Sequence, residues 1–248
     1  MTVSLARRAV AELVGTALLL VAVIGSGIAA ARLSPDDVGL QLLENAAATA
    51  AALVAIILAV GPVSGAHLNP VVTLADRFFG GVSTREAGVY VVAQVVGGAL
   101  GVVVANLMFS LPAVELSTTG RSTGGLWLGE VVATFGLLLV VFGVVRSGRT
   151  GIAPFAVGAY IGGAYFATSS TSFVNPAVTL ARTLSDTFAG IEPASVPAFV
   201  LAQLAGAALA VAVVRVLYPD MSGAAGDVLV PHDNDPDAIR PQPDKELS

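Results

Sequence analysis

The chain contains no cysteine, which excludes disulfides and thiolate metal sites. Charge is also scarce: Asp, Glu, Lys and Arg make up 12% of the 248 residues, whereas hydrophobic residues make up 55% and the mean hydropathy is +0.84. This composition lies far outside the range of soluble domains. We therefore predict a protein of the lipid bilayer.

The few charges are unevenly distributed. Residues 1–219 carry ten acidic and ten basic side chains, so the body of the chain is neutral. The excess of acid lies in residues 218–248, where seven carboxylates face only Arg240 and Lys245. This segment is rich in Pro, Asp and Gly and has no apolar periodicity, which predicts a disordered, solvated tail. A solvated end is favoured there over an acidic interaction segment.

Apolar runs locate the membrane spans, because a helix needs about 20 apolar residues to cross the hydrocarbon. Four runs have the length of one span each: residues 13–31, 87–110, 126–145 and 195–217.

Two further runs are too long for one helix and too short for two. Residues 45–75 and 150–181 are uncharged throughout. Each begins as an apolar helix and is interrupted by small or polar residues, at 61–65 and at 168–172. A full span followed by a half-span of about ten residues accounts for each run, because irregular backbone at membrane depth requires protein or water around it. The predicted fold class is all-α, with six transmembrane helices and two re-entrant half-helices.

Each predicted half-helix begins with the same phrase. One copy, His-Leu-Asn-Pro-Val-Val-Thr-Leu-Ala, occupies residues 67–75, and the other, Phe-Val-Asn-Pro-Ala-Val-Thr-Leu-Ala, occupies 173–181. Proline suits the first helical turn, and the preceding Asn caps the helix. Two helix N-termini bring unpaired N–H groups and partial positive charge to the midplane. The amides of Asn69 and Asn175 can then donate to a passing neutral solute and repel cations, which predicts a pore rather than two simple caps.

Other segments also occur twice. Residues 11–16 (Ala-Glu-Leu-Val-Gly-Thr) match 129–134, and residues 93–100 match 202–209. Three spans per half is an odd number, so the second copy is inserted upside down. We expect inverted repeats at about 10–110 and 126–217, which place the site near the midplane on the axis that relates them.

Basic residues set the expected orientation. In a six-span topology one face of the membrane receives most of the arginines, namely Arg7, Arg8, Arg77, Arg85, Arg146, Arg149 and Arg215. Only Arg32, Arg121 and Arg182 fall near the other face. We therefore expect a cytoplasmic N-terminus at 1–9, a channel domain at 10–217 and a cytoplasmic tail, in the inner (plasma) membrane.

The residues described so far resemble the aquaporin, or major intrinsic protein, family over roughly residues 8–217. The motifs that carry the resemblance are Ser-Gly-Ala-His-Leu-Asn-Pro-Val-Val-Thr-Leu at 64–74 and Asn-Pro-Ala at 175–177. The resemblance implies a right-handed bundle in the bilayer, a homotetramer with one pore in each protomer, and passive conduction of small neutral solutes without a cofactor. It also implies no enzyme activity, no catalytic residues, no metal and no nucleic-acid partner. The implied pore motifs are Asn69, Pro70, Val71, Asn175, Pro176 and Ala177, with Val71 where alanine is usual.

Two glutamates lie within the predicted spans, where an unpaired charge costs several kcal/mol. In the family, glutamates at the positions of Glu12 and Glu130 accept hydrogen bonds from the re-entrant loops, so the resemblance implies a bracing role. A proton-coupled site is the less favoured interpretation. For His67, bracing the loop is favoured over a gate or a pH sensor.

The resemblance also implies a constriction of four residues outward of the Asn-Pro pair. Counting along the chain gives Thr49, Gly163, Ser172 and Val178, with Gly162 or Ala164 as alternatives for Gly163. Most family members carry an arginine where this chain has Val178, and Arg182 follows four residues later, at the expected outer end of the half-helix.

These residues predict a wide, moderately polar opening without fixed positive charge. Water, glycerol- or urea-type solutes and neutral metalloid or organoarsenical species would pass it, and a bacterial subset linked to arsenic resistance similarly lacks the arginine. A strict water channel, a proton-coupled carrier using Glu12 or Glu130, and a non-transporting scaffold of the lens-junction kind are the alternatives.

Overall fold

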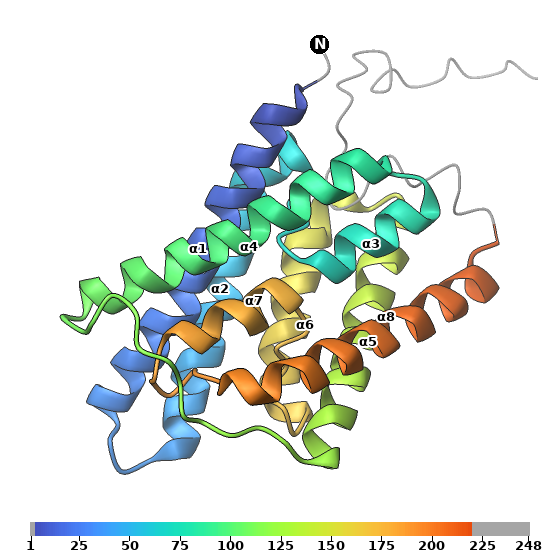
Figure 1. Cartoon of the computed structure of the whole chain (residues 1–248). Coiled ribbons are helices and arrows are strands. Elements are labelled where there is room, and N and C mark those ends of the chain that lie inside the picture. Colours follow the sequence, from blue (N-terminus) through green and yellow to red (C-terminus); the bar gives the residue numbers. More distant parts are fainter. Residues whose placement is uncertain (1–2, 220–248) are drawn as a thin grey trace, which may run out of the picture.

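The computed structural model describes residues 3–219, which form eight α-helices, three 3₁₀ turns and no β-strand. Two short helices, α3 and α7, lie between α4 and α8 (Figure 1). The helices are α1 (Leu5–Leu33), α2 (Val38–Ser64), α3 (Pro70–Phe79), α4 (Thr84–Met108), α5 (Gly124–Arg146), α6 (Ala153–Ala167), α7 (Pro176–Ala181) and α8 (Val196–Leu217).

Six helices form the bundle around the two short ones. Five of them, α1, α2, α4, α5 and α8, are long and apolar enough to cross a membrane by themselves. The sixth, α6, has only 15 residues and follows the 3₁₀ turn η1 (Thr150–Ile152). The prediction of six spans and two half-helices is confirmed, with α6 shorter than expected.

The two re-entrant segments differ from the predicted boundaries. Helix α2 continues through Gly61 and Pro62 to Ser64, and ends at Gly65 with a left-handed φ of 83°. Pro62 has no N–H to donate to the carbonyl of Leu58, four residues back, and the helix ends within one turn after it. In the second half, α6 ends at Ala167, so the predicted break at 168–172 is correct. Helix α7 has six residues, followed by the 3₁₀ turn η2 (Arg182–Leu184), and is shorter than predicted.

The two halves pack in corresponding ways: α1 contacts α4 and α2, and α5 contacts α8 and α6. Glycine residues allow the helices in each half to approach closely. A Cβ atom added at Gly97 or Gly101 would lie 2.2 Å from a backbone oxygen of α1, and one added at Gly206 would lie 2.4 Å from a backbone oxygen of α5. Small residues therefore let these helices approach with backbone against backbone, as in other membrane bundles.

Both ends of the described chain lie on the same face of the bundle. Arg8, near the start of α1, pairs with Glu86 at the start of α4. Arg215, near the end of α8, stacks on Phe78 of α3, with its guanidinium carbon 4.4 Å from the ring centroid. The predicted acidic tail lies outside the described residues, apart from its first two.

A long loop, residues 109–123, crosses the opposite face from α4 to α5 (Figure 1). It is fixed to the segment after α7 by backbone hydrogen bonds, for example from Ser117 N to Thr183 O at 2.9 Å and from Glu192 N to Thr119 O at 2.8 Å. We call this face, which carries the loop, the outer face, because the arginine-rich face is expected to be cytoplasmic.

A candidate pore between the half-helices

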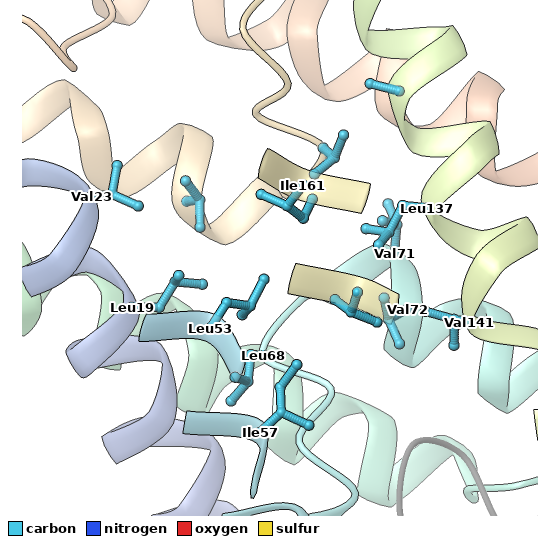
Figure 2. Packing of buried hydrophobic residues seen from close by; sticks show 14 of the residues in the cluster. Leu19, Val23, Leu53, Ile57, Leu68, Val71, Val72, Leu137, Val141 and Ile161 are labelled. Carbon is cyan, nitrogen blue, oxygen red and sulfur yellow. The ribbon is translucent and has the colours of Figure 1, made fainter. Parts of the chain in front are cut away.

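A cavity of about 60 Å³ lies where the two half-helices meet, and both halves of the chain line it. Its walls are mostly aliphatic side chains of the long helices. Figure 2 shows these side chains facing one another, and every residue that it labels except Val71 lines the cavity. Polar groups reach the cavity chiefly from the first re-entrant loop (residues 65–69) and the second (residues 168–175).

Asn69 and Asn175 perform the same two tasks in each half. The Oδ1 atom of each caps its own half-helix, accepting from Val71 N at 3.0 Å and from Ala177 N at 3.0 Å. The Nδ2 atom of each donates across the midplane: Asn69 to Val174 O at 2.8 Å, and Asn175 to Leu68 O at 2.7 Å. An amide carries two N–H groups, so one on each asparagine is left for the cavity that both residues line.

Glu12 and Glu130 contact the re-entrant loops from inside the bundle, and both are fully buried. Glu12 accepts from His67 N at 2.9 Å and from Leu68 N at 2.7 Å. Glu130 accepts from the N–H groups of Phe173 and Val174, each at 2.8 Å. Each carboxylate therefore satisfies two backbone donors that the loop geometry leaves without a carbonyl partner.

Two buried glutamines complete this pattern. Gln94 donates to Glu12 at 2.8 Å and to Thr73 at 3.0 Å. Gln203 donates to Glu130 at 2.6 Å and to Thr179 at 2.8 Å. Thr73 and Thr179 belong to the half-helices, so each glutamine ties its glutamate to the half-helix that the same glutamate supports.

The backbone of both loops is strained at matching positions. Ala66 and Leu68 have φ values of 49° and 52°, and Ser172 and Val174 have 55° and 48°. A left-handed conformation is costly for any residue other than glycine and especially for the β-branched Val174. The Glu12 and Glu130 hydrogen bonds offset this strain, because they hold the N–H groups of Leu68 and Val174.

His67 lines the cavity and is buried. Its Nδ1 lies 3.1 Å from the Thr73 hydroxyl, and its Nε2 lies 3.6 Å from the buried carboxylate of Asp76. The ring also packs edge-on against Tyr90, with 5.2 Å between centroids. The imidazole thus connects the loop to α3 and α4.

Three of the four predicted constriction residues, Thr49, Ser172 and Val178, line the cavity. Gly163 does not: it is exposed on the outside of α6, and a Cβ atom there would have no neighbour within 4 Å. The alternatives Gly162 and Ala164 are not lining residues either. Tyr165 lines the cavity instead, with its hydroxyl 3.3 Å from Thr49 Oγ1. A helical count would have found it, because Val157, Ile161 and Tyr165 recur every four residues on one face.

The prediction of an opening without fixed positive charge is wrong. Arg182 lines the cavity and is only 3% exposed. Its guanidinium carbon lies 3.5 Å from the centroid of the Phe173 ring, and its Nε donates to Ala189 O. The side chain therefore points back along α7 instead of continuing outward. Its length makes this possible, since a guanidinium can lie one helical turn away from its own Cα atom.

The motif residues beside the asparagines face away from the cavity. Pro70, Pro176 and Ala177 are absent from the lining, and so is Val71, which is 0% exposed. Val71 instead lines a groove between α3 and α8. The extra methyl groups of Val71 relative to alanine thus affect helix packing and not the cavity wall.

Two re-entrant helices that meet end to end in an apolar bundle, over a cavity lined from both, define a multi-pass membrane channel. The model of the major intrinsic protein family matches residues 1–171 and, in an overlapping second match, 154–236. The chain belongs to this family, whose members are channels and not enzymes.

Individual relatives agree with this assignment. The chain is 47% identical over 211 residues to the aquaglyceroporin AqpS of Rhizobium meliloti, covering 85% of this chain and 90% of that protein. It is 33% identical over 236 residues to a probable aquaporin AqpM of Archaeoglobus fulgidus, covering 85% and 96%. The X-ray structure of the aquaglyceroporin from Plasmodium falciparum shares the fold, with a TM-score of 0.68, 23% identity, and 89% and 100% of the two chains covered.

Proposed function

We propose that this chain is a passive channel for water and small uncharged solutes of the glycerol and urea type, and that neutral metalloid and organoarsenical species also pass. The observation that carries the proposal is the reciprocal contact of Asn69 and Asn175 with the opposite loop, beside a cavity that both residues line. Aliphatic walls with a few aligned donors suit solutes that present one apolar and one hydroxylated edge. The similarity to an aquaglyceroporin over most of the chain supports glycerol as a solute.

We assign the constriction to Thr49, Tyr165, Ser172 and Val178, with Arg182 as its cation. Tyr165 and Arg182 make the ring narrower and more polar than four small residues would. The positive ends of α3 and α7, the two asparagine amides and Arg182 together oppose the passage of cations and protons.

The proposal also includes roles for the residues that hold the re-entrant loops, and the orientation and oligomeric state of the channel. Glu12 and Glu130 hold the re-entrant loops, and His67 holds the first of them to α3. The arginine-rich face, with both termini, is cytoplasmic, and the protein acts as a homotetramer in the inner membrane. The channel domain consists of the inverted repeats at about 10–110 and 126–217, and the matching hydrogen bonds of the two loops support this division.

Two variants, one that widens the pore and one that narrows it, test the assignment of the constriction. Tyr165→Ala removes a buried ring from it, and we expect faster entry of glycerol. Val178→Arg adds a second long side chain beside Arg182, and we expect slower passage of the larger solutes than of water. Swelling of proteoliposomes in a panel of water, glycerol, urea and arsenite measures both effects. If neither variant changes the ratio of large-solute to water flux, the constriction lies elsewhere.

A proton gradient separates the channel from a carrier. All four carboxylate oxygens of Glu12 and Glu130 accept hydrogen bonds from loop N–H groups or glutamines, so neither residue is available to cycle a proton. We expect glycerol flux into proteoliposomes to be the same with and without an imposed pH difference. Flux that follows the sign of that difference would instead identify a proton-coupled carrier.

A further inference from the structure

A second cavity, of about 200 Å³, opens on the outer side of the constriction. We call it the outer vestibule. Its polar lining consists of Asn45, Arg121, Thr171 and Arg182, and its apolar wall is formed by the first turns of α2 and by Phe188. Arg182 lines both cavities, so it stands at the boundary between the vestibule and the constriction.

The two arginines come from different segments and contact the same aromatic ring, and the charge of Arg121 acts on Arg182. Arg121 belongs to the loop at 109–123, and its Nε donates to Gly190 O at 3.1 Å. The Nε of Arg182 donates to the preceding carbonyl, that of Ala189. Both guanidinium groups contact the ring of Phe173, with their central carbons 5.0 Å and 3.5 Å from its centroid. One hydrogen bond and one aromatic face thus position each guanidinium.

Neither arginine forms an ion pair within residues 3–219. The same part of the chain offers no hydrogen-bond acceptor to the terminal amino groups of either residue. Arg182 is buried and Arg121 is half-buried. Arginines in such places are normally paired, because an isolated charge in a bundle is costly. Glu130 attracts both cations, but its oxygens are taken up by the second re-entrant loop and Gln203. Burial lowers the pKa of Arg121, so desolvation outweighs that attraction.

We propose that the outer vestibule binds a small oxyanion from the aqueous phase between Arg121 and Arg182. A guanidinium offers parallel N–H groups that match two oxygens of one anion, and two such groups favour an oxyanion over a single-atom halide. The vestibule has room for several water-sized groups, and Thr171 adds a hydroxyl. Because Arg182 also lines the constriction, a bound oxyanion obstructs the entry of neutral solutes from the outer face. This binding goes beyond the proposed conduction of neutral solutes.

Inorganic phosphate is a direct probe, since its ³¹P resonance broadens on binding to the purified protein in a non-ionic detergent. Arg121→Gln removes one cation without touching the constriction cavity, whose lining does not include Arg121. Arg32→Gln is a matched control. Arg32 also donates to a backbone carbonyl, that of Phe109, and its guanidinium carbon lies 5.3 Å from the Phe109 ring centroid, but it lines neither cavity.

We expect phosphate to bind the wild type and Arg32→Gln equally, and Arg121→Gln about tenfold more weakly, as for the loss of a charge-assisted hydrogen bond. Arg182→Gln, if it folds, should weaken binding at least as much. Chloride at equal ionic strength should not displace phosphate. No broadening in the wild type, equal broadening in all variants, or full displacement by chloride would each overturn the proposal.

Glycerol flux provides an independent test of the oxyanion site. We expect phosphate added outside proteoliposomes to slow glycerol entry through those wild-type channels whose outer face is exposed to it. The slowing should be smaller in Arg121→Gln. If glycerol passes but phosphate does not bind, only the proposed oxyanion site in the vestibule is overturned. Phosphate binding without any glycerol flux would instead contradict the proposed channel function.

Discussion

Asn175→Leu is expected to abolish most of the solute flux while leaving the protein inserted in the membrane. The substitution removes the cap from the N–H groups of Ala177 and Val178 and the donor from Leu68 O. It also places an isobutyl group in a cavity of about 60 Å³. A buried polar group left without a partner costs about 1–3 kcal/mol. If the barrier to a polar solute rises by about 2 kcal/mol, flux falls about thirtyfold.

Stopped-flow swelling of proteoliposomes, normalised to the amount of reconstituted protein, measures this loss for water and for glycerol. Leu180→Ala is the control. It lies on the same half-helix, its side chain is 46% exposed, and it does not line the cavity, so its flux should match the wild type. Wild-type flux in Asn175→Leu would mean that solutes do not pass between the half-helices. A non-transporting scaffold would show no specific flux even in the wild type.

Gly101→Ala is expected to cause a large loss of stability, although it adds only one methyl group. The new Cβ atom would lie 2.2 Å from the carbonyl oxygen of Ala17, and backbone on backbone cannot give way as a flexible side chain can. The α1–α4 contact must open, and overpacking of this kind costs about 1–3 kcal/mol or more. We expect a lower unfolding temperature in detergent and a smaller folded fraction after purification.

Gly88→Ala, in the same helix, is the matched control. Its added Cβ would meet no heavy atom within 4 Å, so the only change is the helical preference for alanine, which is worth about 0.5–1 kcal/mol. We expect its unfolding temperature to be unchanged or slightly raised. Equal stability of the two variants would show that the α1–α4 contact tolerates a wider separation.

The topology could be predicted from the sequence because it depends on features that a bilayer makes obligatory. Uncharged runs of fixed length, interrupted before each Asn-Pro pair, permit few arrangements in a medium without water. The short lengths of α6 and α7 could not be predicted from these runs. A short helix next to a 3₁₀ turn, such as α6 after η1 or α7 before η2, has the same composition as a longer helix, and packing decides the boundary.

The cavity lining was harder to predict than the fold. Thr49, Ser172 and Val178 were located by counting from the Asn-Pro motifs, and that count is safe where the backbone keeps one register. It failed at Gly163, because the face of α6 that meets the cavity is set by helical phase, and an error of two residues turns the helix by more than half a turn.

Arg182 was misjudged for a different reason. Its Cα atom lies one helical turn beyond Val178, and its position in the sequence indicated a cation outside the opening. The acceptor at Ala189 and the ring of Phe173 direct the side chain back to the cavity. Where a long side chain ends depends on contacts that only the folded structure brings together.

The exchange of amide hydrogen bonds between the two loops bears on how such a chain could have originated. Asn69 finds its acceptor only in the second half, at Val174, and Asn175 finds its acceptor only in the first, at Leu68. A polypeptide with a single repeat would leave its asparagine amide and its loop carbonyl without partners at membrane depth. An ancestor of that size would have needed a second copy inserted in the opposite orientation, and gene fusion would then have made that antiparallel pairing permanent.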